Sequence, residues 1–83
     1  MNGINYTSHA LERMDEYNIS QMLVYLALRF GREELTKGGC VKYRLRQNEI
    51  NIYAIQDENV MPIELILSCK GSRQVVTVYL IGN

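Results

Sequence analysis

The spacing of apolar residues changes near the middle of this chain, at Lys37-Gly38-Gly39. Before this point, apolar side chains recur every three or four residues, which is the period of an amphipathic helix. After it, apolar and polar residues alternate in short runs separated by turn residues, which is typical of strands. The sequence therefore predicts helices in the first part of the chain and a sheet in the second.

Two helices are predicted in the first part. The first runs from about Ser8 to Tyr17, with Ser8 as its N-cap and Asn18 as a residue that tolerates the left-handed conformation at a helix end. The second follows Ser20 as its N-cap, runs to about Phe30 and is stopped by Gly31. The expected buried residues are Ala10, Leu11, Met14 and Tyr17 in the first helix, and Met22, Leu23, Leu26, Ala27 and Phe30 in the second.

Four alternating runs, residues 41–46, 50–55, 63–68 and 75–80, are predicted to be strands. The connections between them are too short for crossover helices, so we expect antiparallel hairpins. The fold class that follows is α+β, one domain over residues 1–83 with two N-terminal helices packed on a four-stranded antiparallel β-meander. The expected turns are Gln47-Asn48, Asp57-Glu58-Asn59 and Lys70-Gly71-Ser72.

Composition limits the classes of function. The nine basic and nine acidic residues cancel, which argues against a strongly basic, sequence-independent nucleic-acid binder. No apolar run approaches the roughly 20 residues needed to span a bilayer, and the start of the chain lacks the pattern of a signal peptide, so we expect a cytoplasmic protein with no membrane partner. Cys40 and Cys69 are expected to be reduced, with Cys69 facing the core. With a single histidine they do not make a zinc site, so no metal or other cofactor is implied.

The charges are unevenly distributed along the chain. Between Arg29 and Arg46 there are six basic residues and two acidic ones. This run indicates either a local basic patch on a neutral protein or an ordinary solvated face.

The only histidine, His9, lies four residues before Arg13 in the first predicted helix, so both side chains share a face near the helix N-terminus. Metal-free RNA cleavage needs a base, an acid and cations around the phosphate. His9 is suited to act as the base, and Arg13 is suited to hold the phosphate. The hydroxyl of Thr77 or Tyr79 is a candidate for orienting the RNA or relaying a proton. Alternatively, His9 is structural and Arg13 forms a surface salt bridge with Glu12 or Glu16.

The sheet face turned away from the helices is expected to mix cations, hydroxyls, rings and apolar groups. Such a face suits RNA, through stacking and phosphate contacts, and it also suits a homodimer interface. Lys42, Arg44 and Arg73 are candidates for contact with phosphate. The expected residues of this face are Lys42, Arg44, Tyr53, Ile55, Ile66, Ser68, Val75, Thr77 and Tyr79.

Several segments of the chain form a pattern typical of a known family. They are Tyr6-Thr7-Ser8-His9-Ala10-Leu11-Glu12-Arg13-Met14, Ile19-Ser20, Gly31, Tyr43-Arg44-Leu45 and Val76-Thr77-Val78. Together they resemble the domain of unknown function 4258 family, which looks like a branch of the RelE-like toxin superfamily that also groups barnase, EndoU and colicin-type ribonucleases. The resemblance implies helices followed by an antiparallel sheet, and metal-independent RNA cleavage in a toxin–antitoxin or phage–host setting. His9 and Arg13 match the family's polar N-terminal pair, and Tyr43 and Thr77 match recurrent strand positions, which adds Tyr43 to the RNA-binding candidates.

Two functions are therefore expected as alternatives. The first is a small RelE-like RNA-binding or metal-independent ribonuclease domain of the toxin type, with RNA and a cognate antitoxin as partners. The second is a non-catalytic protein-binding module, such as a phage-encoded inhibitor of a host or defence protein. The apolar character of the second helix favours the latter, with Tyr25 and Leu28 as candidate contacts.

Overall fold

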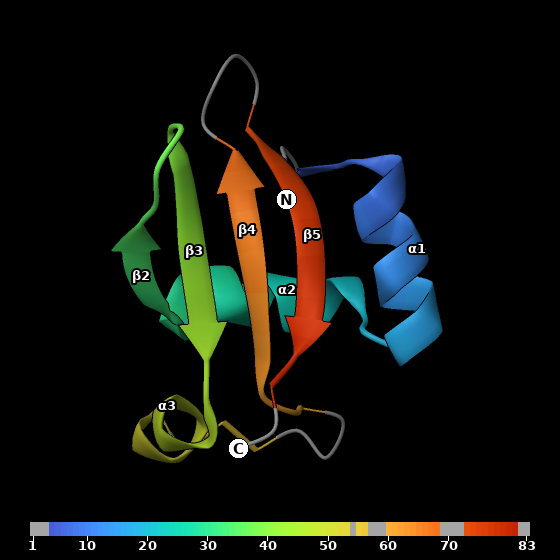
Figure 1. The fold of residues 1–83 in the computed structure, drawn as a ribbon. Helices are drawn as coiled ribbons and strands as arrows, with labels where there is room; N and C mark the ends of the chain where they lie inside the picture. Colours follow the sequence, from blue (N-terminus) through green and yellow to red (C-terminus); the bar gives the residue numbers. More distant parts are fainter. Residues whose placement is uncertain (1–3, 54, 57–59, 69–72, 82–83) are drawn as a thin grey trace.

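The computed structural model describes residues 4–53, 55–56, 60–68 and 73–81. Within them the fold is α+β, with three helices and one five-stranded mixed sheet (Figure 1). The predicted turns at 57–59 and 70–72 and the predicted placement of Cys69 lie outside these residues. The elements are β1 (Asn5–Tyr6), α1 (Ser8–Tyr17), α2 (Gln21–Phe30), β2 (Arg32–Leu35), β3 (Cys40–Leu45), α3 (Gln47–Ile52), β4 (Ile63–Ser68) and β5 (Gln74–Leu80).

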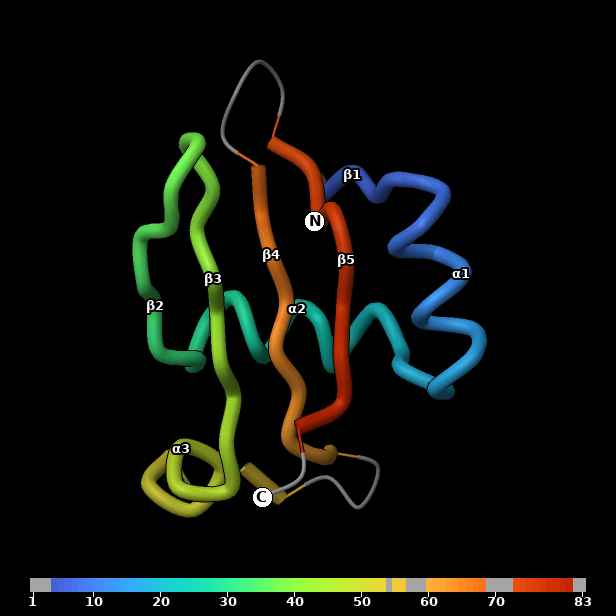
Figure 2. Tube along the Cα trace, viewed as in Figure 1, coloured from blue at the N-terminus to red at the C-terminus, as the bar shows by residue number. Residues whose placement is uncertain are grey.

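The strands lie side by side in the order β1-β5-β4-β3-β2. Strands β2 to β5 pair antiparallel with their neighbours, whereas β1 runs parallel to β5. Helix α2 crosses one face of the sheet and α1 lies along β5 (Figures 1 and 2). We call the face under α2 the helix-covered face. The opposite one, which carries Lys42, Arg44, Glu64 and Ile66, is the open face.

The core lies between α2 and the helix-covered face. The alternation predicted for two strands is confirmed, because every second residue of β3 and of β4 is buried. In β5 the alternation is interrupted by a register shift opposite Ile66 and Leu67, so Val75 and Val78 both face the core. The expectation that Val75 lies on the open face was therefore wrong.

The bounds predicted for α1 are confirmed, but its N-cap is Thr7 and not Ser8. The Thr7 hydroxyl accepts a hydrogen bond from the Ala10 N–H at 3.1 Å and donates one to the Val76 carbonyl at 2.8 Å. It therefore ties the helix start to β5. Only the narrow stripe of Ala10 and Met14 is fully covered, so Leu11, which was expected in the core, is 48% exposed.

The turns that delimit α1 and α2 follow the sequence prediction. Asn18 adopts the left-handed conformation, with a φ of 60°, and its N–H donates to the end of α1. The Ser20 hydroxyl caps α2 by accepting from the Leu23 N–H at 3.1 Å. These two residues turn the chain from the edge of the sheet to its helix-covered face.

The run 50–55, predicted to be the second strand, instead belongs mainly to helix α3 and the residues that follow it. Both edges of β3 are already occupied, by β2 and β4, so no place in the sheet remains for it. The Glu49 carboxylate accepts a hydrogen bond from the Arg46 N–H at 2.9 Å and fixes the first turn, where a hairpin turn at Gln47-Asn48 was expected. Ile50 is buried but Ile52 is 65% exposed, which fits a helix.

Strand β2 was not predicted, because its residues carry no apolar alternation and all four are exposed. It forms a hairpin with β3 through Gly38 and Gly39, whose φ angles are 83° and 79°. Residues with side chains rarely adopt such angles, so this glycine pair is the local signal for the turn. The Thr36 N–H closes the hairpin by donating to the Cys40 carbonyl at 2.9 Å.

Replacing Gly31 with alanine is expected to destabilise the fold. Gly31 lies between α2 and β2, and a Cβ there would collide with the Ala27 carbonyl oxygen and lie 3.0 Å from that of Arg44. Both are backbone atoms, so the chain itself would have to move, at a cost of about 1–3 kcal/mol. Thermal melts should show the loss, and an unchanged melting temperature would contradict this close approach.

Candidate functional site

Three arginines converge on the open face where β2, β3 and α3 meet. Arg32 lies directly opposite Arg44 in the pairing of β2 with β3, and Arg46 follows two residues later. The three side chains line a cavity of about 100 Å³ together with Asn48 and Glu49. Like charges placed opposite each other on a sheet are destabilising, so an anion bound among them would be favourable. We call Arg32, Arg44 and Arg46 the arginine cluster.

Carboxylates hold one member of the arginine cluster in place. The Arg44 Nε donates to Glu64 Oε1 at 3.0 Å, and its Nη1 lies 3.9 Å from Glu34 Oε1. Lys42 shares the Glu64 carboxylate, with its Nζ 3.9 Å from Oε2. Within the described part of the chain, the side chains of Arg32 and Arg46 make no ion pair. Arg44 is thus positioned by acids, whereas its two neighbours keep their donors for another anion.

The four RNA-binding candidates from the sequence divide between the two faces of the sheet. Lys42 and Arg44 lie together on the open face. Tyr43 points to the helix-covered face, where it is 8% exposed and its hydroxyl donates to Glu33 Oε2 at 3.0 Å. Arg73, just before β5, lines a pocket on that same side with Tyr43. The structure therefore does not bring all four residues to one surface.

The predicted catalytic pair, His9 and Arg13, lies on α1, near the edge of the sheet opposite to β2. His9 is exposed in the first turn of α1, which packs against β5, whereas the arginine cluster lies on β2 and β3. Neighbouring strands are about 4.8 Å apart, so roughly 10 Å or more separates the two places. Arg13 forms the salt bridge expected in the alternative interpretation, with its Nη1 2.6 Å from Glu16 Oε1. Its guanidinium also lies 5.9 Å from the centre of the Tyr17 ring.

The other two catalytic candidates lie on β5. Thr77 is only 7% exposed, and its hydroxyl oxygen has no hydrogen-bond partner among the described residues. Tyr79 is largely exposed and pairs with Glu64 across β4 and β5. Tyr79 is therefore reachable by a ligand on the open face, whereas the Thr77 hydroxyl is enclosed.

Replacing Thr77 with valine is expected to preserve or raise stability. The substitution exchanges a buried hydroxyl without a partner for a methyl group of similar shape, and leaving such a hydroxyl unsatisfied costs about 1–3 kcal/mol. Valine also suits a strand. Thermal melts of the wild type and Thr77→Val provide the measurement. A clear loss of stability would show that the hydroxyl has a partner which the described residues do not contain.

Two residues of the arginine cluster, Arg32 and Arg46, were not among the candidates from the sequence. Both lie in the basic run that the charge analysis identified, which was the available signal. Their convergence depends on β2 and α3, and neither element was predicted. A hairpin turn recognised at Gly38-Gly39 would have placed Arg32 beside Arg44.

No group of three or more His, Cys, Asp or Glu side chains in the described ranges is arranged to hold a metal ion. None of the helices formed by these residues has the length and apolar character needed to cross a membrane. Comparisons with models of protein families, with curated proteins and with solved structures find no match to this chain.

Proposed function

We propose that this chain is a small RelE-like RNA-binding domain, acting in the cytoplasm, that holds a backbone phosphate of single-stranded RNA at the arginine cluster. The observation that carries the proposal is the convergence of Arg32, Arg44 and Arg46 on a cavity of about 100 Å³. This volume is equivalent to roughly three water molecules, which suits a phosphate group. Guanidinium groups match phosphate oxygens in geometry and charge.

The surroundings of the cluster also suit RNA. The exposed ring of Tyr79 lies on the same face and offers a stacking surface for a base. The acidic residues Glu34, Glu49 and Glu64 lie close to the cluster, so its field is local and the net charge of the chain stays at zero. Affinity would therefore come from a few well-placed contacts. Helices α1 and α2 precede the antiparallel strands β2 to β5, which is the order that the RelE-like resemblance implies, but β1 comes before these helices and α3 lies between β3 and β4.

Metal-independent cleavage is the activity that the same resemblance implies. In this proposal His9 acts as the base, Arg13 contacts the scissile phosphate and Tyr79 orients the RNA. The arginine cluster would hold a neighbouring phosphate of the same strand, because β4 and β5 separate it from α1. RNA binding and RNA cleavage therefore rest on different residues and can be tested separately.

One set of samples tests both parts. A short labelled single-stranded RNA is titrated with the protein in EDTA, anisotropy reports binding, and the same samples are then run on a denaturing gel. We expect Arg32→Ala to weaken binding and His9→Ala to leave binding intact while removing any cleavage. Lys37→Ala is the matched control, because it removes one exposed positive charge in the β2–β3 turn. If Lys37→Ala and Arg32→Ala weaken binding equally, the cluster is not the binding site.

Replacing Glu34 with glutamine is expected to increase affinity for RNA, by about twofold to fivefold. The Glu34 carboxylate lies 3.9 Å from Arg44 and is largely exposed. Its negative charge weakens the attraction of the cluster for a phosphate, and because solvent screens such an exposed charge, the effect on the binding free energy is about 0–1 kcal/mol. The anisotropy titration measures the change. An unchanged or lower affinity would mean that the phosphate does not bind next to Arg44.

A protein-binding module is the second candidate function, and exposed apolar side chains favour it. Met22, Leu35 and Ile52 are all exposed, Leu35 to 82%. Tyr25 and Leu28, the contacts suggested by the sequence, are instead half-buried in a pocket. Binding of a protein partner, such as a cognate antitoxin or a second copy of the chain, should be lost in Leu35→Ser, whereas RNA binding should be unchanged. Light scattering of the wild type and this variant would reveal a homodimer.

A further inference from the structure

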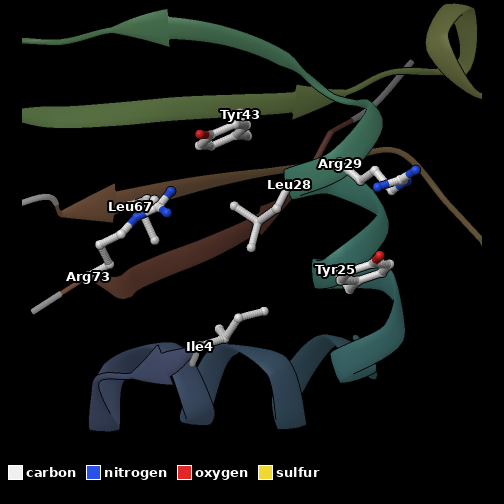
Figure 3. A pocket seen from close by; sticks show the side chains of 7 residues that line it. All are labelled: Ile4, Tyr25, Leu28, Arg29, Tyr43, Leu67 and Arg73. Carbon is white, nitrogen blue, oxygen red and sulfur yellow. The ribbon is translucent and has the colours of Figure 1, made fainter. Parts of the chain in front are cut away.

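A second pocket lies on the helix-covered side, between α2 and the sheet, and has a volume of about 290 Å³ (Figure 3). Ile4, Leu28 and Leu67 supply its apolar surface, and the rings of Tyr25 and Tyr43 lie at its sides. Arg29 and Arg73 complete the lining from α2 and from the residue before β5. The pocket thus combines apolar groups, aromatic rings and two positive charges.

We propose that this pocket binds a small planar aromatic molecule that carries an anionic group. Its volume lies at the lower end of the range for ligand pockets, which favours a small molecule. Tyr25, Leu28 and Leu67 offer a surface for a flat ring. Arg29 and Arg73 lie at opposite ends of the pocket (Figure 3), and each offers charge-assisted hydrogen bonds to a carboxylate or a phosphate.

The charges around the pocket support an anion and not a cation. No acidic residue is among the described residues that line it. In the described part of the chain neither Arg29 nor Arg73 forms an ion pair, and the Arg29 guanidinium lies 5.6 Å from the ring centre of its neighbour Phe30. The Glu33 carboxylate, outside the lining, accepts the Tyr43 hydroxyl hydrogen at 3.0 Å.

The position of Arg29 follows from the helix period. It lies four residues after Tyr25 on α2, so the ring and the guanidinium share one side of the helix. A ligand stacked near Tyr25 can therefore present its anionic group to Arg29. This pocket and the arginine cluster lie on opposite faces of the sheet, so the inference does not depend on RNA binding.

The test uses 2-naphthoate as the anionic probe and 2-naphthylmethylamine, which has the same ring system and the opposite charge, as its control. Backbone amide shifts of the ¹⁵N-labelled protein report both affinity and location. We expect saturable shifts at the pocket residues, with the amine binding about tenfold more weakly, because it meets two arginines. Uridine 5′-monophosphate is the second anionic probe, and its affinity relative to 2-naphthoate distinguishes a nucleotide phosphate from a carboxylate head group.

Two charge-removing variants complete the test. Arg29→Gln and Arg73→Gln both change exposed positions, and the variant that removes the arginine holding the carboxylate should weaken 2-naphthoate binding about fivefold, whereas Lys37→Gln should not change it. The amide spectra of the variants check that the fold is retained. Equal binding of 2-naphthoate and the amine, shifts scattered over the surface, unchanged affinity in both arginine variants, or no saturable binding of either anionic probe would overturn the proposal.

Discussion

Removing Arg32 and Arg46 together should weaken binding of single-stranded RNA by about thirtyfold. Both guanidinium groups line the cavity on the open face and form no ion pair within the described ranges, so their donors are free for a phosphate. A partly exposed, charge-assisted contact contributes about 1 kcal/mol, and two of them correspond to this factor. Anisotropy titrations of Arg32→Ala/Arg46→Ala against the wild type, at one fixed salt concentration, measure the loss.

Two controls belong with this double variant. Lys37→Ala removes a cation from the β2–β3 turn and should leave affinity nearly unchanged. Thermal melts should show that the double variant still folds, since removing two neighbouring positive charges from around Arg44 relieves repulsion. Unchanged RNA affinity in a folded double variant would place the binding surface elsewhere.

Replacing Leu65 with alanine should destabilise the fold by about 3 kcal/mol and lower the melting temperature by roughly 15 °C. Leu65 is fully buried on β4, the middle strand of the sheet, and is paired with Tyr43 on one side and Val78 on the other. The lost side chain leaves a cavity where the sheet meets α2. Thermal or urea unfolding gives the measurement.

Ile66→Ala is the matched control for Leu65→Ala. It truncates the next residue of the same strand, whose side chain points to the open face and is only partly buried. A much smaller loss of stability is expected, because less apolar surface returns to water. Equal losses for the two variants would contradict the assignment of the core to the helix-covered face.

Helices α1 and α2 and the strands β3, β4 and β5 could be predicted because their signals are local. Ser20 and Asn18 cap the helices as their residue types favour. In β4 the apolar residues at every second position are the ones that are buried on one face of the sheet. The N-cap of α1 was misassigned by one residue, since Thr7 and Ser8 are both good caps. The Thr7 hydroxyl also bonds to the Val76 carbonyl, a residue far away in the sequence.

The remaining elements depend on contacts that are distant in sequence. Residues 50–52 alternate like a strand, but β2 and β4 already occupy both sides of β3, so a short helix packs below it instead. Strand β2 consists mainly of charged residues and is held by its pairing with β3. A pattern that measures apolar spacing cannot detect such an edge strand.

The candidate site was predictable to a similar extent. Alternation along β3 placed Lys42 and Arg44 on the open face. The same alternation groups Tyr43 with Val41 and Leu45 in the core, and only the family resemblance had added it to the RNA-binding set. Arg32 joins Arg44 through a strand pairing that the sequence did not reveal.

The salt dependence of RNA binding tests the central claim most directly. Each phosphate contact with a single strand contributes about −0.7 to the slope of the logarithm of the binding constant against the logarithm of salt concentration. We predict a negative slope for the wild type that becomes shallower by about 0.7 in Arg32→Ala and stays unchanged in Lys37→Ala. An identical slope in the wild type and Arg32→Ala would show that the arginine cluster does not hold a phosphate.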